Sequence, residues 1–596
     1  MSPALHRAGV PGPTMPMTDQ GSSGLRAAPL QTDAPLSLAQ RAARRLLVYA
    51  GLLSAFVNLL MLTGPLYMMQ VYDRVLASRS FETLAVITAL IVALFAAMAL
   101  LDFARSALLA RAGGEFEDTL KDLVFDKAAD GALRGAMSAE QPIKDLRQIR
   151  QFVGSPALTA IFDAPWTPFF LGIVVLMHWL LGVVAIAGLL ALVALAAINE
   201  RVSRRAFLDA VGAAGEADRL ALATFRNAAA ADAMGLRRPL KARWLALSQA
   251  ANDHAVTASD RTSGLTAATK ASRMLLQSLI LGTGAFLAIR GALSPGAMIA
   301  ASIIAGRALA PVEIVTGQWK NFLQAGTAYA RLKNFLGNAI APQARTRLPA
   351  PEGAIAVDRI FCQPGGAKKP VLKSVSFSLE PGEALGVIGP SAAGKSTLAR
   401  ALVGVERLVS GVIRLDGAEL SQWGSEDLGP HIGFLPQEVE LFAGTAAANI
   451  SRFRDDARDE DVIAAAKAAG AHEMILSFAD GYDTEIGERG RHLSAGQRQR
   501  LGLARALFGN PALVVLDEPN ANLDAEGDAA LALAIQGLKA RRATLVVIAH
   551  RPNAIAGVDK LLLLADGEVR AFGPRDEILQ QLAPQQVQTL RTKAGG

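Results

Sequence analysis

The chain has 596 residues, of which 51% are hydrophobic, and it carries a formal net charge of +7 with a single cysteine. This length allows more than one domain, and the lone Cys362 excludes an intramolecular disulfide. The positive charge does not indicate a nucleic-acid partner, because the sequence has no basic patch interleaved with aromatic residues.

Residues 1–37 are predicted to be a disordered tail. Up to about Pro35 they are rich in proline, glycine, serine and threonine and show no helical period. They also lack the continuous apolar core of a secretory signal, so we do not expect a cleavable signal here.

Residues 38–340 are predicted to form an all-α transmembrane domain with six spans. Six predominantly apolar segments approach the roughly 20 residues that cross a hydrocarbon core of about 30 Å. The alternative, a soluble domain with six buried helices, is disfavoured by the density of such segments. The six segments are 46–71, 84–101, 159–177, 180–198, 274–289 and 297–315.

The distribution of basic residues predicts how the spans are oriented. Segment 201–273 carries twelve Lys or Arg residues and segment 105–150 carries eight, whereas the turn at His178 has none and the turn after the fifth span has only Arg290. Basic segments remain on the cytoplasmic side. We therefore expect a multi-pass protein whose termini and C-terminal domain are cytoplasmic.

The two long cytoplasmic segments, 102–159 and 199–273, are predicted to be largely helical and to extend the spans. Residues 226–235 are a candidate tip for contact with the C-terminal domain, although such helices can also be plain surface helices. Pro311 is predicted to kink the last span or mark its flexible point.

Arg307 lies about halfway along the last span, where an ionisable residue is a functional hypothesis. We expect Arg307 to face a water-filled pathway or a partner carboxylate, and a structural ion pair remains an equal alternative. Four charged residues near the outer end of the first hairpin are expected to be merely solvated: Asp73, Arg74, Arg79 and Glu82.

Residues 350–596 are predicted to form an α/β nucleotide-binding domain with a phosphate loop. The apolar run 384–388 precedes a full match to G-x-x-x-x-G-K-[ST], and a helix-like segment follows. Backbone N–H groups of such a loop cradle phosphates, its lysine reaches the β- and γ-phosphates, and its hydroxyl holds Mg²⁺. The predicted loop residues are Gly389, Pro390, Ser391, Ala392, Ala393, Gly394, Lys395, Ser396 and Thr397.

Two later apolar runs, 513–516 and 544–548, predict buried parallel strands that end in polar residues. After the first run, Asp517 is expected to lie behind Mg²⁺, and Glu518 to orient or deprotonate the attacking water. His550 follows the second run. Taken alone, the histidine is more typical of a core position and the acidic pair of a solvated strand end.

The segment Leu493-Ser494-Ala495-Gly496-Gln497 precedes these strands, and alone it would be read as a helix capping box. In their order, the phosphate loop, this segment, Asp-Glu, Asn522-Leu523-Asp524 and the strand-end His550 resemble the ATPase domain of the ABC transporter family. The resemblance covers roughly residues 353–583. It implies that ATP with Mg²⁺ is sandwiched between two subunits, so the protein is expected to be a dimer.

The resemblance also implies roles for single residues. Gln437 matches a glutamine that touches Mg²⁺, Ser494 and Gly496 match residues that hold the γ-phosphate bound to the other subunit, and Asp524 matches a link between the ATPase halves. The predicted catalytic residues are Glu518, His550 and Gln437, the magnesium residues are Ser396, Gln437 and Asp517, and the nucleotide set adds Ser494, Gly496, Gln497 and Asp524 to the loop.

The sequence departs from the family pattern in three places. Ala495 replaces the usual glycine, and the loop ending in Asp524 reads Ala-Asn-Leu-Asp instead of Ser-Ala-Leu-Asp. Gln363 stands where many members stack a tyrosine on adenine, and Phe361 is the alternative aromatic. The adenine contact is therefore left open, whereas the intact Glu518 indicates an active ATPase.

Stretches of the membrane half, 64–75, 162–166, 293–302 and 306–311, look like type I secretion ABC exporters, in the branch for proteases, lipases and surface-layer proteins with glycine-rich repeats. This resemblance covers most of 38–583. It implies an inner-membrane homodimer that works with a periplasmic adaptor and an outer-membrane channel, and that exports an unfolded protein with a C-terminal signal. An exporter of lipids or small molecules and an ATP-gated channel are the alternatives.

Overall fold

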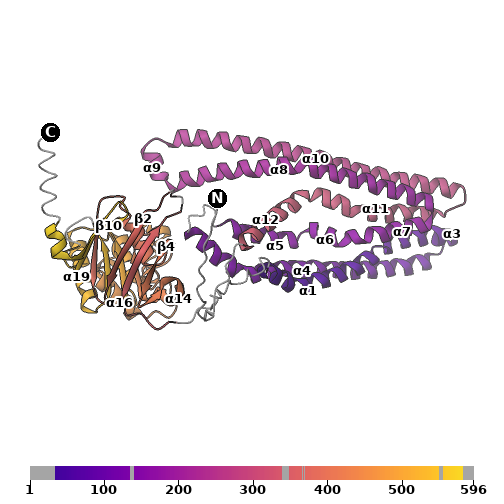
Figure 1. Ribbon diagram of the computed structural model, residues 1–596. Coiled ribbons are helices and arrows are strands. Elements are labelled where there is room, and N and C mark those ends of the chain that lie inside the picture. The colour runs from indigo at the N-terminus through magenta and orange to yellow at the C-terminus, as the bar shows by residue number, and fades with distance from the viewer. Residues whose placement is uncertain are drawn as a thin grey trace, which may run out of the picture. The chain divides into compact units, whose positions relative to one another are not determined.

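The computed structural model describes residues 34–133, 140–337, 348–365, 367, 369–549 and 555–581 (Figure 1). These residues divide into two compact units, a helical one up to residue 337 and an α/β one from residue 348, with the short segment 129–133 grouped with the second. The predicted disordered tail lies outside the described residues except at its end, where helix α1 already begins at Ala34.

The helical unit is built from helices of very different lengths. Three of them have 48 or more residues, and a helix rises about 1.5 Å per residue, so each is longer than a bilayer is thick. The helices are α1 Ala34–Leu60, α2 Thr63–Gln70, α3 Leu76–Ser78, α4 Phe81–Leu133, α5 Gln141–Val153, α6 Pro156–Asp163, α7 Thr167–Met177, α8 Trp179–Arg226, α9 Ala228–Ala233, α10 Arg237–Ile289, α11 Pro295–Gly317 and α12 Trp319–Gly337, with a π-turn at Val71–Val75 and a 3₁₀ turn at Ala164–Trp166.

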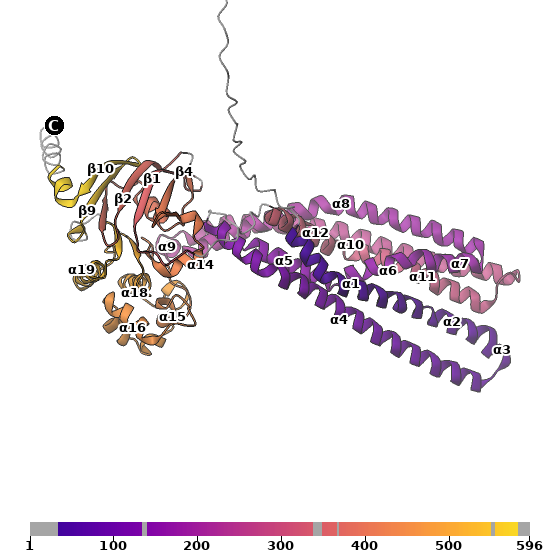
Figure 2. The same ribbon diagram turned by 60° about the horizontal axis from the view of Figure 1, so that its bottom comes forward.

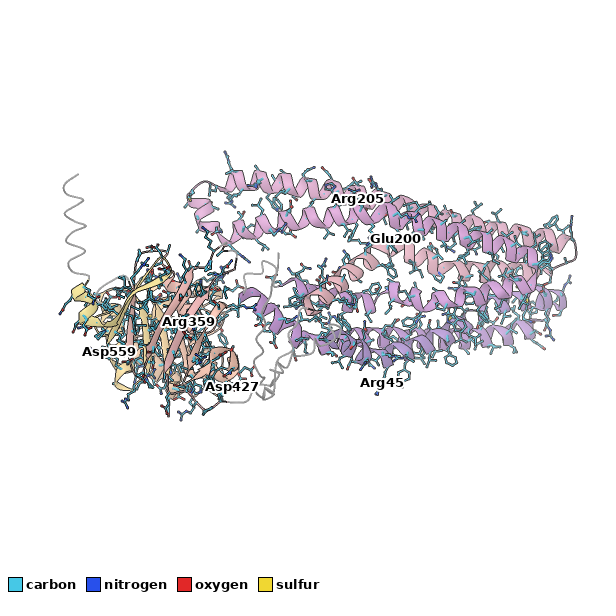
Figure 3. The ribbon with its side chains drawn as sticks, in the orientation of Figure 1. Arg45, Glu200, Arg205, Arg359, Asp427 and Asp559 are labelled. Atoms are coloured by element: carbon cyan, nitrogen blue, oxygen red, sulfur yellow. The ribbon has the colours of Figure 1, made fainter. Side chains whose placement is uncertain are left out.

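Six helical stretches in the described residues are long and apolar enough to cross a membrane, which confirms the six predicted spans. Two of these three long helices, α8 and α10, run side by side and are joined by the short α9 at one end (Figures 1 and 2). Charged side chains such as Glu200 and Arg205 lie on α8 just beyond its apolar part (Figure 3). The predicted tip at residues 226–235 coincides with α9 and its flanking turns.

The helix starts follow local rules of capping. Ser294 caps α11 by accepting a hydrogen bond from the Ala297 N–H at 3.1 Å, and Pro295 occupies the first turn, where its missing N–H costs nothing. At the start of α8 the His178 ring accepts from the Leu180 N–H at 3.1 Å.

Asp73 links the outer end of the first hairpin to the start of α11. One carboxylate oxygen accepts a hydrogen bond from Ser294 Oγ at 2.5 Å and the other from the Gly296 N–H at 2.7 Å. A Cβ atom on Gly296 would lie 2.6 Å from this carboxylate, so a side chain at this position would push Asp73 away from its two hydrogen bonds. The expectation that Asp73 is merely solvated is wrong, because the π-turn brings it to residues more than 200 positions away in the sequence.

A cluster of polar side chains, the Asp163 cluster, joins α1, α4 and α6 inside the helical unit. It consists of Ser54, Asn58, Arg105 and Asp163. One oxygen of Asp163 accepts hydrogen bonds from Ser54 at 2.6 Å, from Asn58 at 2.7 Å and from Arg105 at 2.9 Å. The three donor residues are at most 4% exposed. Arg105 also pairs with the exposed Asp102 at 2.5 Å, so removal of Asp163 would take away the more buried of its two carboxylate partners and the acceptor that the three donors share.

We expect Asp163→Ala to destabilise the purified protein by about 3 kcal/mol, because the buried Arg105 guanidinium would keep only the exposed Asp102 as an ionic partner and Ser54 and Asn58 would lose their shared acceptor. The loss is measured as a lower midpoint of thermal unfolding in detergent. Asp118→Ala is the matched control, because Asp118 pairs with Lys121 on the exposed surface of α4 and its removal should not shift the midpoint measurably. Equal midpoints for both variants would contradict the role of the cluster.

The α/β unit contains two sheets. A four-stranded antiparallel sheet has the order β2-β1-β4-β5, and a six-stranded sheet has the order β10-β9-β3-β8-β7-β6, in which β10 alone is antiparallel to its neighbour. The strands are β1 Ile355–Cys362, β2 Leu372–Leu379, β3 Ala384–Ile388, β4 Leu408–Leu415, β5 Ala418–Glu419, β6 Ile432–Leu435, β7 Leu513–Asp517, β8 Thr544–Ile548, β9 Lys560–Ala565 and β10 Glu568–Pro574.

Helices surround these sheets, and β7 and β8 are buried along their whole length, as their unbroken apolar runs predict. Asp559, labelled in Figure 3, accepts from the Ala384 N–H at 3.0 Å and pairs with Lys539 at 2.7 Å, which ties helix α19 (Ala525–Ala540) to the start of β3. The helices are α13 Lys395–Leu402, α14 Ser425–Leu428, α15 Ala446–Ile450, α16 Asp459–Ala468, α17 His472–Leu476, α18 Ala495–Leu507 and α19 Ala525–Ala540.

The lone cysteine is part of this apolar core. Cys362 at the end of β1 has no exposed surface, and burial raises the pKa of its thiol to about 11. The thiolate is the reactive form, so the cysteine should be inert in the folded protein.

We therefore expect N-ethylmaleimide at pH 7.5 to label the native protein at least about tenfold more slowly than the protein unfolded in guanidinium chloride, as a thiol with a raised pKa requires. The extent of labelling is followed by mass spectrometry. A variant with one exposed cysteine, Asp118→Cys, reports on the reagent, since its second thiol should react rapidly without denaturant. Equally rapid labelling of native and unfolded wild type would show that Cys362 is accessible.

Candidate nucleotide-binding site

Four adjacent parallel strands bring the predicted site residues to one edge of the larger sheet. In the order β3-β8-β7-β6, the carboxyl ends lead into the phosphate loop, Ala549, the Asp517-Glu518 pair and Gln437. Ligands of open parallel sheets bind at this edge. The predicted His550 follows Ala549 but lies outside the described residues.

The phosphate loop joins β3 to α13 by a backbone that only glycine fits at two points. Gly394 caps α13 with a φ of 98°, and a Cβ atom on Gly389 would lie 2.0 Å from the carbonyl oxygen of Leu564. Lys395 folds back over the loop and donates hydrogen bonds of 2.9 Å to the carbonyl oxygens of Gly389 and Pro390. The loop therefore presents the N-terminal N–H groups of α13 together with a lysine, a combination that binds phosphates.

Burial lowers the pKa of Lys395, and the nearby carboxylates of Glu518 and Asp517 act in the opposite direction. The loop and the carboxyl end of β7 are thus in electrostatic contact. Asp517 is 3% exposed, and its burial raises the pKa of its carboxyl group although a hydrogen bond from Ser396 lowers it.

The residues at this edge suit a magnesium ion. One oxygen of Asp517 is buried and has no hydrogen-bond partner among the described residues, and the Ser396 hydroxyl lies beside the same carboxylate. Mg²⁺ prefers oxygen ligands and is commonly held by one or two carboxylates plus phosphates and water. The described residues contain no group of three metal-ligating acidic, histidine or cysteine side chains, and this mode of binding does not need one.

Glu518 adopts a backbone conformation that is rare for a residue with a side chain. Its φ is 50°, and its N–H donates to the carbonyl oxygen of Ile548 at 3.0 Å. A left-handed residue costs of order 1–3 kcal/mol and tends to occur at functional sites. The conformation turns the chain sharply after β7 and leaves the carboxylate half-buried at the edge of the sheet.

The predicted signature segment begins α18. Ser494 Oγ accepts from the Gln497 N–H at 3.2 Å, while the Gln497 side chain accepts from the Ser494 N–H at 2.8 Å, so this segment is a capping box. Both Ser494 and Ala495 are exposed, and the extra methyl of Ala495 is accommodated at the first helical position. The capping and functional interpretations are compatible, because the cap holds Ser494 and Ala495 in place at the exposed start of α18.

The signature segment and the predicted Asp524 loop are held together. A Cβ atom on Gly496 would lie 3.0 Å from the carbonyl oxygen of Asn522, and Arg500 pairs with Asp524 at 2.7 Å. Asp524 also caps α19 through the Gly527 N–H at 2.8 Å, which is the main cause of the lowered pKa of Asp524. No hydrogen bond or ion pair in the described structure joins residues 494–497 to the phosphate loop.

Two residues of this link were not identified from the sequence. Arg500 pairs with Asp524, and buried Gln499 donates to the carbonyl oxygen of Pro519 at 3.0 Å. Both lie on α18 three and four residues after Gly496, and this helical spacing places them on the same face as Gly496.

The two candidates for the adenine contact have other neighbours. The Gln363 side chain donates to the carbonyl oxygen of Ala367 at 2.7 Å and closes its own loop. Phe361 lines a surface pocket with Lys373, Ser376 and Val569, while its neighbour Cys362 points into the core. The adenine contact stays open.

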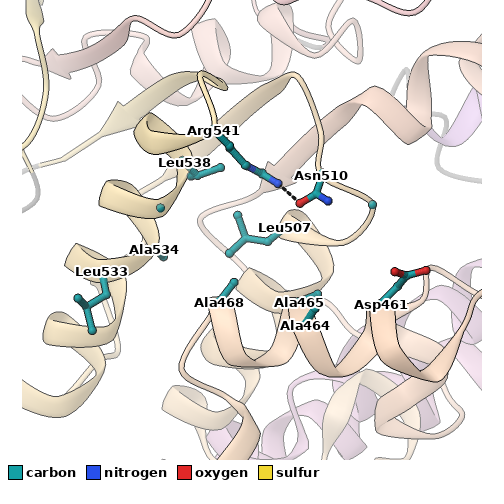
Figure 4. A pocket seen from close by; sticks show the side chains of 12 residues that line it. Asp461, Ala464, Ala465, Ala468, Leu507, Asn510, Leu533, Ala534, Leu538 and Arg541 are labelled. Carbon is teal, nitrogen blue, oxygen red and sulfur yellow. Dashed lines mark hydrogen bonds between the residues drawn. The ribbon is translucent and has the colours of Figure 1, made fainter.

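A separate pocket of about 230 Å³ lies between α16, the end of α18 and α19 (Figure 4). Alanine and leucine side chains form most of its lining, and Arg541 donates a hydrogen bond to the Asn510 side chain at one end. None of its lining residues belongs to the predicted site, so this pocket is not part of the nucleotide site.

We expect Gly389→Ala to weaken ATP binding at least about tenfold, because the new methyl would displace the carbonyl group of Leu564 and deform the loop that meets the phosphates. Binding of a fluorescent ATP analogue measures the effect. Gly537→Ala makes the same change on α19, where a Cβ atom meets nothing within 4 Å, and should leave binding unchanged. Normal binding by Gly389→Ala would show that the loop tolerates the methyl group.

Comparison with known proteins agrees with this architecture. The model of the ABC transporter family matches residues 372–521, and the model of the ABC transporter transmembrane region matches residues 142–309. The structure of a bacterial Atm1-family ABC exporter with ATP bound has a TM-score of 0.79 at 23% identity, over 90% of this chain and 96% of that one, which is a likeness of fold.

Several relatives are similar over most of their length. The type I secretion system ATP-binding protein PrsD of Rhizobium meliloti (strain 1021) is 43% identical over 553 residues, 92% of this chain and 95% of PrsD. The cyclolysin secretion/processing ATP-binding protein CyaB of Bordetella pertussis is 28% identical, over 90% of this chain and 76% of CyaB. The leukotoxin translocation ATP-binding protein LktB of a Pasteurella haemolytica-like species is 29% identical, over 90% of this chain and 77% of LktB.

The chain belongs to the ABC transporter family, the class that its fold and its nucleotide site define. Within that family it belongs with the ATP-binding proteins of type I secretion systems. It is a multi-pass protein of the inner membrane with a cytoplasmic ATPase domain, and it couples ATP hydrolysis to transport.

Proposed function

We propose that this chain is the ATP-driven permease of a type I secretion system and that it exports an unfolded protein carrying a C-terminal signal. The observation that carries this proposal is the 43% identity to PrsD over 95% of that protein. CyaB is named for the secretion and processing of cyclolysin and LktB for the translocation of leukotoxin, and both relatives support the proposal. An exporter of lipids or small molecules is the weaker alternative, although a fold of this kind alone would suit it.

The proposed chemistry is the hydrolysis of ATP at the edge of the six-stranded sheet. Residues 389–397 bind the phosphates, and Lys395 leaves its loop carbonyl groups to pair with them. Ser396, Asp517 and Gln437 would hold Mg²⁺, which neutralises phosphate charge when bound. Glu518 orients and deprotonates the attacking water, for which its strained position at the strand end prepares it.

We further propose that two copies of the chain complete each site. Ser494, at the exposed start of α18, and its neighbours Gly496 and Gln497 would meet the ATP held by the other copy. Asp524 and His550 would act at the same junction. The contacts between α18 and the loop 519–524 support this arrangement, because they fix the signature segment and Asp524 as one element.

The export pathway would continue beyond this chain. We propose a periplasmic adaptor and an outer-membrane channel as partners, since a protein delivered only to the periplasm would not leave the cell. The domain limits 38–340 and 350–596 assign the membrane pathway to the first part and ATP hydrolysis to the second.

We expect Glu518→Gln to keep ATP binding and to lower steady hydrolysis by about 10²-fold or more, because the neutral amide cannot accept a proton from water. Lys395→Ala should instead lose binding. Hydrolysis is measured as phosphate release by the purified full chain. The control is Glu577→Gln, the same change at an exposed position. Normal turnover by Glu518→Gln would remove the proposed role of Glu518.

The same variants test what is transported. Secreted proteins are compared by mass spectrometry between cells carrying the wild-type chain, Glu518→Gln and Glu577→Gln. Loss of one or a few proteins from the medium, with their accumulation inside, is expected for Glu518→Gln alone. An unchanged secreted set, with hydrolysis abolished, would contradict protein export and favour the lipid or small-molecule alternative.

A further inference from the structure

Only three charged residues occur within the six apolar segments of the membrane domain: Asp163, Arg307 and Glu313. Two of them are neutralised inside the chain. Asp163 pairs with Arg105 at 2.9 Å, and Glu313 on α11 pairs with Arg273 on α10. Arg307 has no hydrogen bond or ion pair with any residue that the structure describes, so its charge is the exception.

Arg307 is also exposed, on a helix that is otherwise well covered. Helix α11 packs against α2, α6, α7, α8 and α10, and from Gly296 to Glu313 its other side chains are buried or half-buried. The least covered stripe follows one side of the helix through Ile303, Arg307, Ala310 and Ile314. A single guanidinium therefore stands on an apolar stripe that the rest of the protomer leaves open.

The depth of Arg307 excludes the ordinary ways of accommodating a membrane arginine. It lies about 18 Å from the Pro295 end of α11 and about 15 Å from the Gly317 end, at about 1.5 Å per residue. Lipid headgroups lie near the ends of such a span, beyond the reach of this side chain, and a charge facing hydrocarbon is costly. The guanidinium must therefore face water, a second copy of the chain, or the transported molecule.

We propose that Arg307 lines the transport pathway and binds carboxylate groups of the polypeptide that passes through it. This inference rests on the proposed export of an unfolded protein and specifies that the pathway favours acidic segments. A guanidinium forms bidentate, charge-assisted hydrogen bonds with carboxylates, and such bonds are strong where water is scarce. The apolar neighbours on the stripe offer no competing partner and do not hinder an extended chain. Repulsion between two like charges disfavours direct contact between the Arg307 residues of two copies.

The test uses the full chain in lipid nanodiscs and two fluorescein-labelled peptides, one with six Gly-Gly-Asp repeats and one with six Gly-Gly-Asn repeats. Fluorescence anisotropy measures their affinities. We expect the wild type to bind the acidic peptide at least about tenfold more tightly than the neutral one, with a preference that falls as salt rises. Arg307→Gln should abolish this preference, and Arg307→Lys should retain most of it. Ile303→Gln is the control, because it changes polarity on the same stripe without removing the charge.

An absent preference in the wild type, or a preference that survives in Arg307→Gln, would overturn the inference. Mass photometry compares the wild type with Arg307→Gln. A dimeric wild type and a monomeric variant would overturn the inference in favour of a contact between copies. These outcomes are separate from those of the secretion experiment. If Glu518→Gln abolishes secretion of a protein while Arg307→Gln leaves the peptide preference intact, protein export stands and only the role of Arg307 fails.

Discussion

A polar group at the level of the hydrocarbon core must find its partner inside the protein, because lipid tails offer none. Helices satisfy this demand for the backbone, and the six spans follow from it. For side chains the same demand explains the Asp163 cluster, in which Ser54, Asn58 and Arg105 converge on one carboxylate oxygen. Glu313, in the last apolar segment, is neutralised in the same way by Arg273. Arg307 differs from these residues, because it is exposed and pairs with no carboxylate among the described residues.

The ATPase unit depends on a different constraint, the shared direction of its parallel strands. Residues that are far apart in the sequence meet because β3, β7 and β6 all end at the same edge. The edge is shaped by backbone that is costly to form, with glycine at 389 and 394 and a left-handed Glu518. The strongly buried β7 and β8 hold this geometry in place, so the rigid core stabilises a strained site.

Much of this could be predicted from the sequence, because the relevant signals are local. Apolar length indicates the spans, and the strand–loop–helix pattern around Lys395 indicates the phosphate loop. The predictions were wrong, or there were none, for contacts between segments that are far apart in the chain. Nothing near Asp73 indicates that it binds the start of α11, and Ser54 and Asn58 appear as minor polar residues in an apolar run until Asp163 is placed beside them. Arg500 is one of many arginines in the sequence, and only its distance to Asp524 distinguishes it.

The buried Cys362 has a practical consequence for the study of this transporter. A chain whose only thiol is shielded in the core is a natural host for spectroscopic probes, because cysteines introduced elsewhere can carry spin labels without a cysteine-free background. In the proposed dimer, labels placed on the open stripe of α11 or at α9 would report distances between the two copies through the ATP cycle. The sequence of states that accompanies transport can thus be followed in a protein altered at one position only.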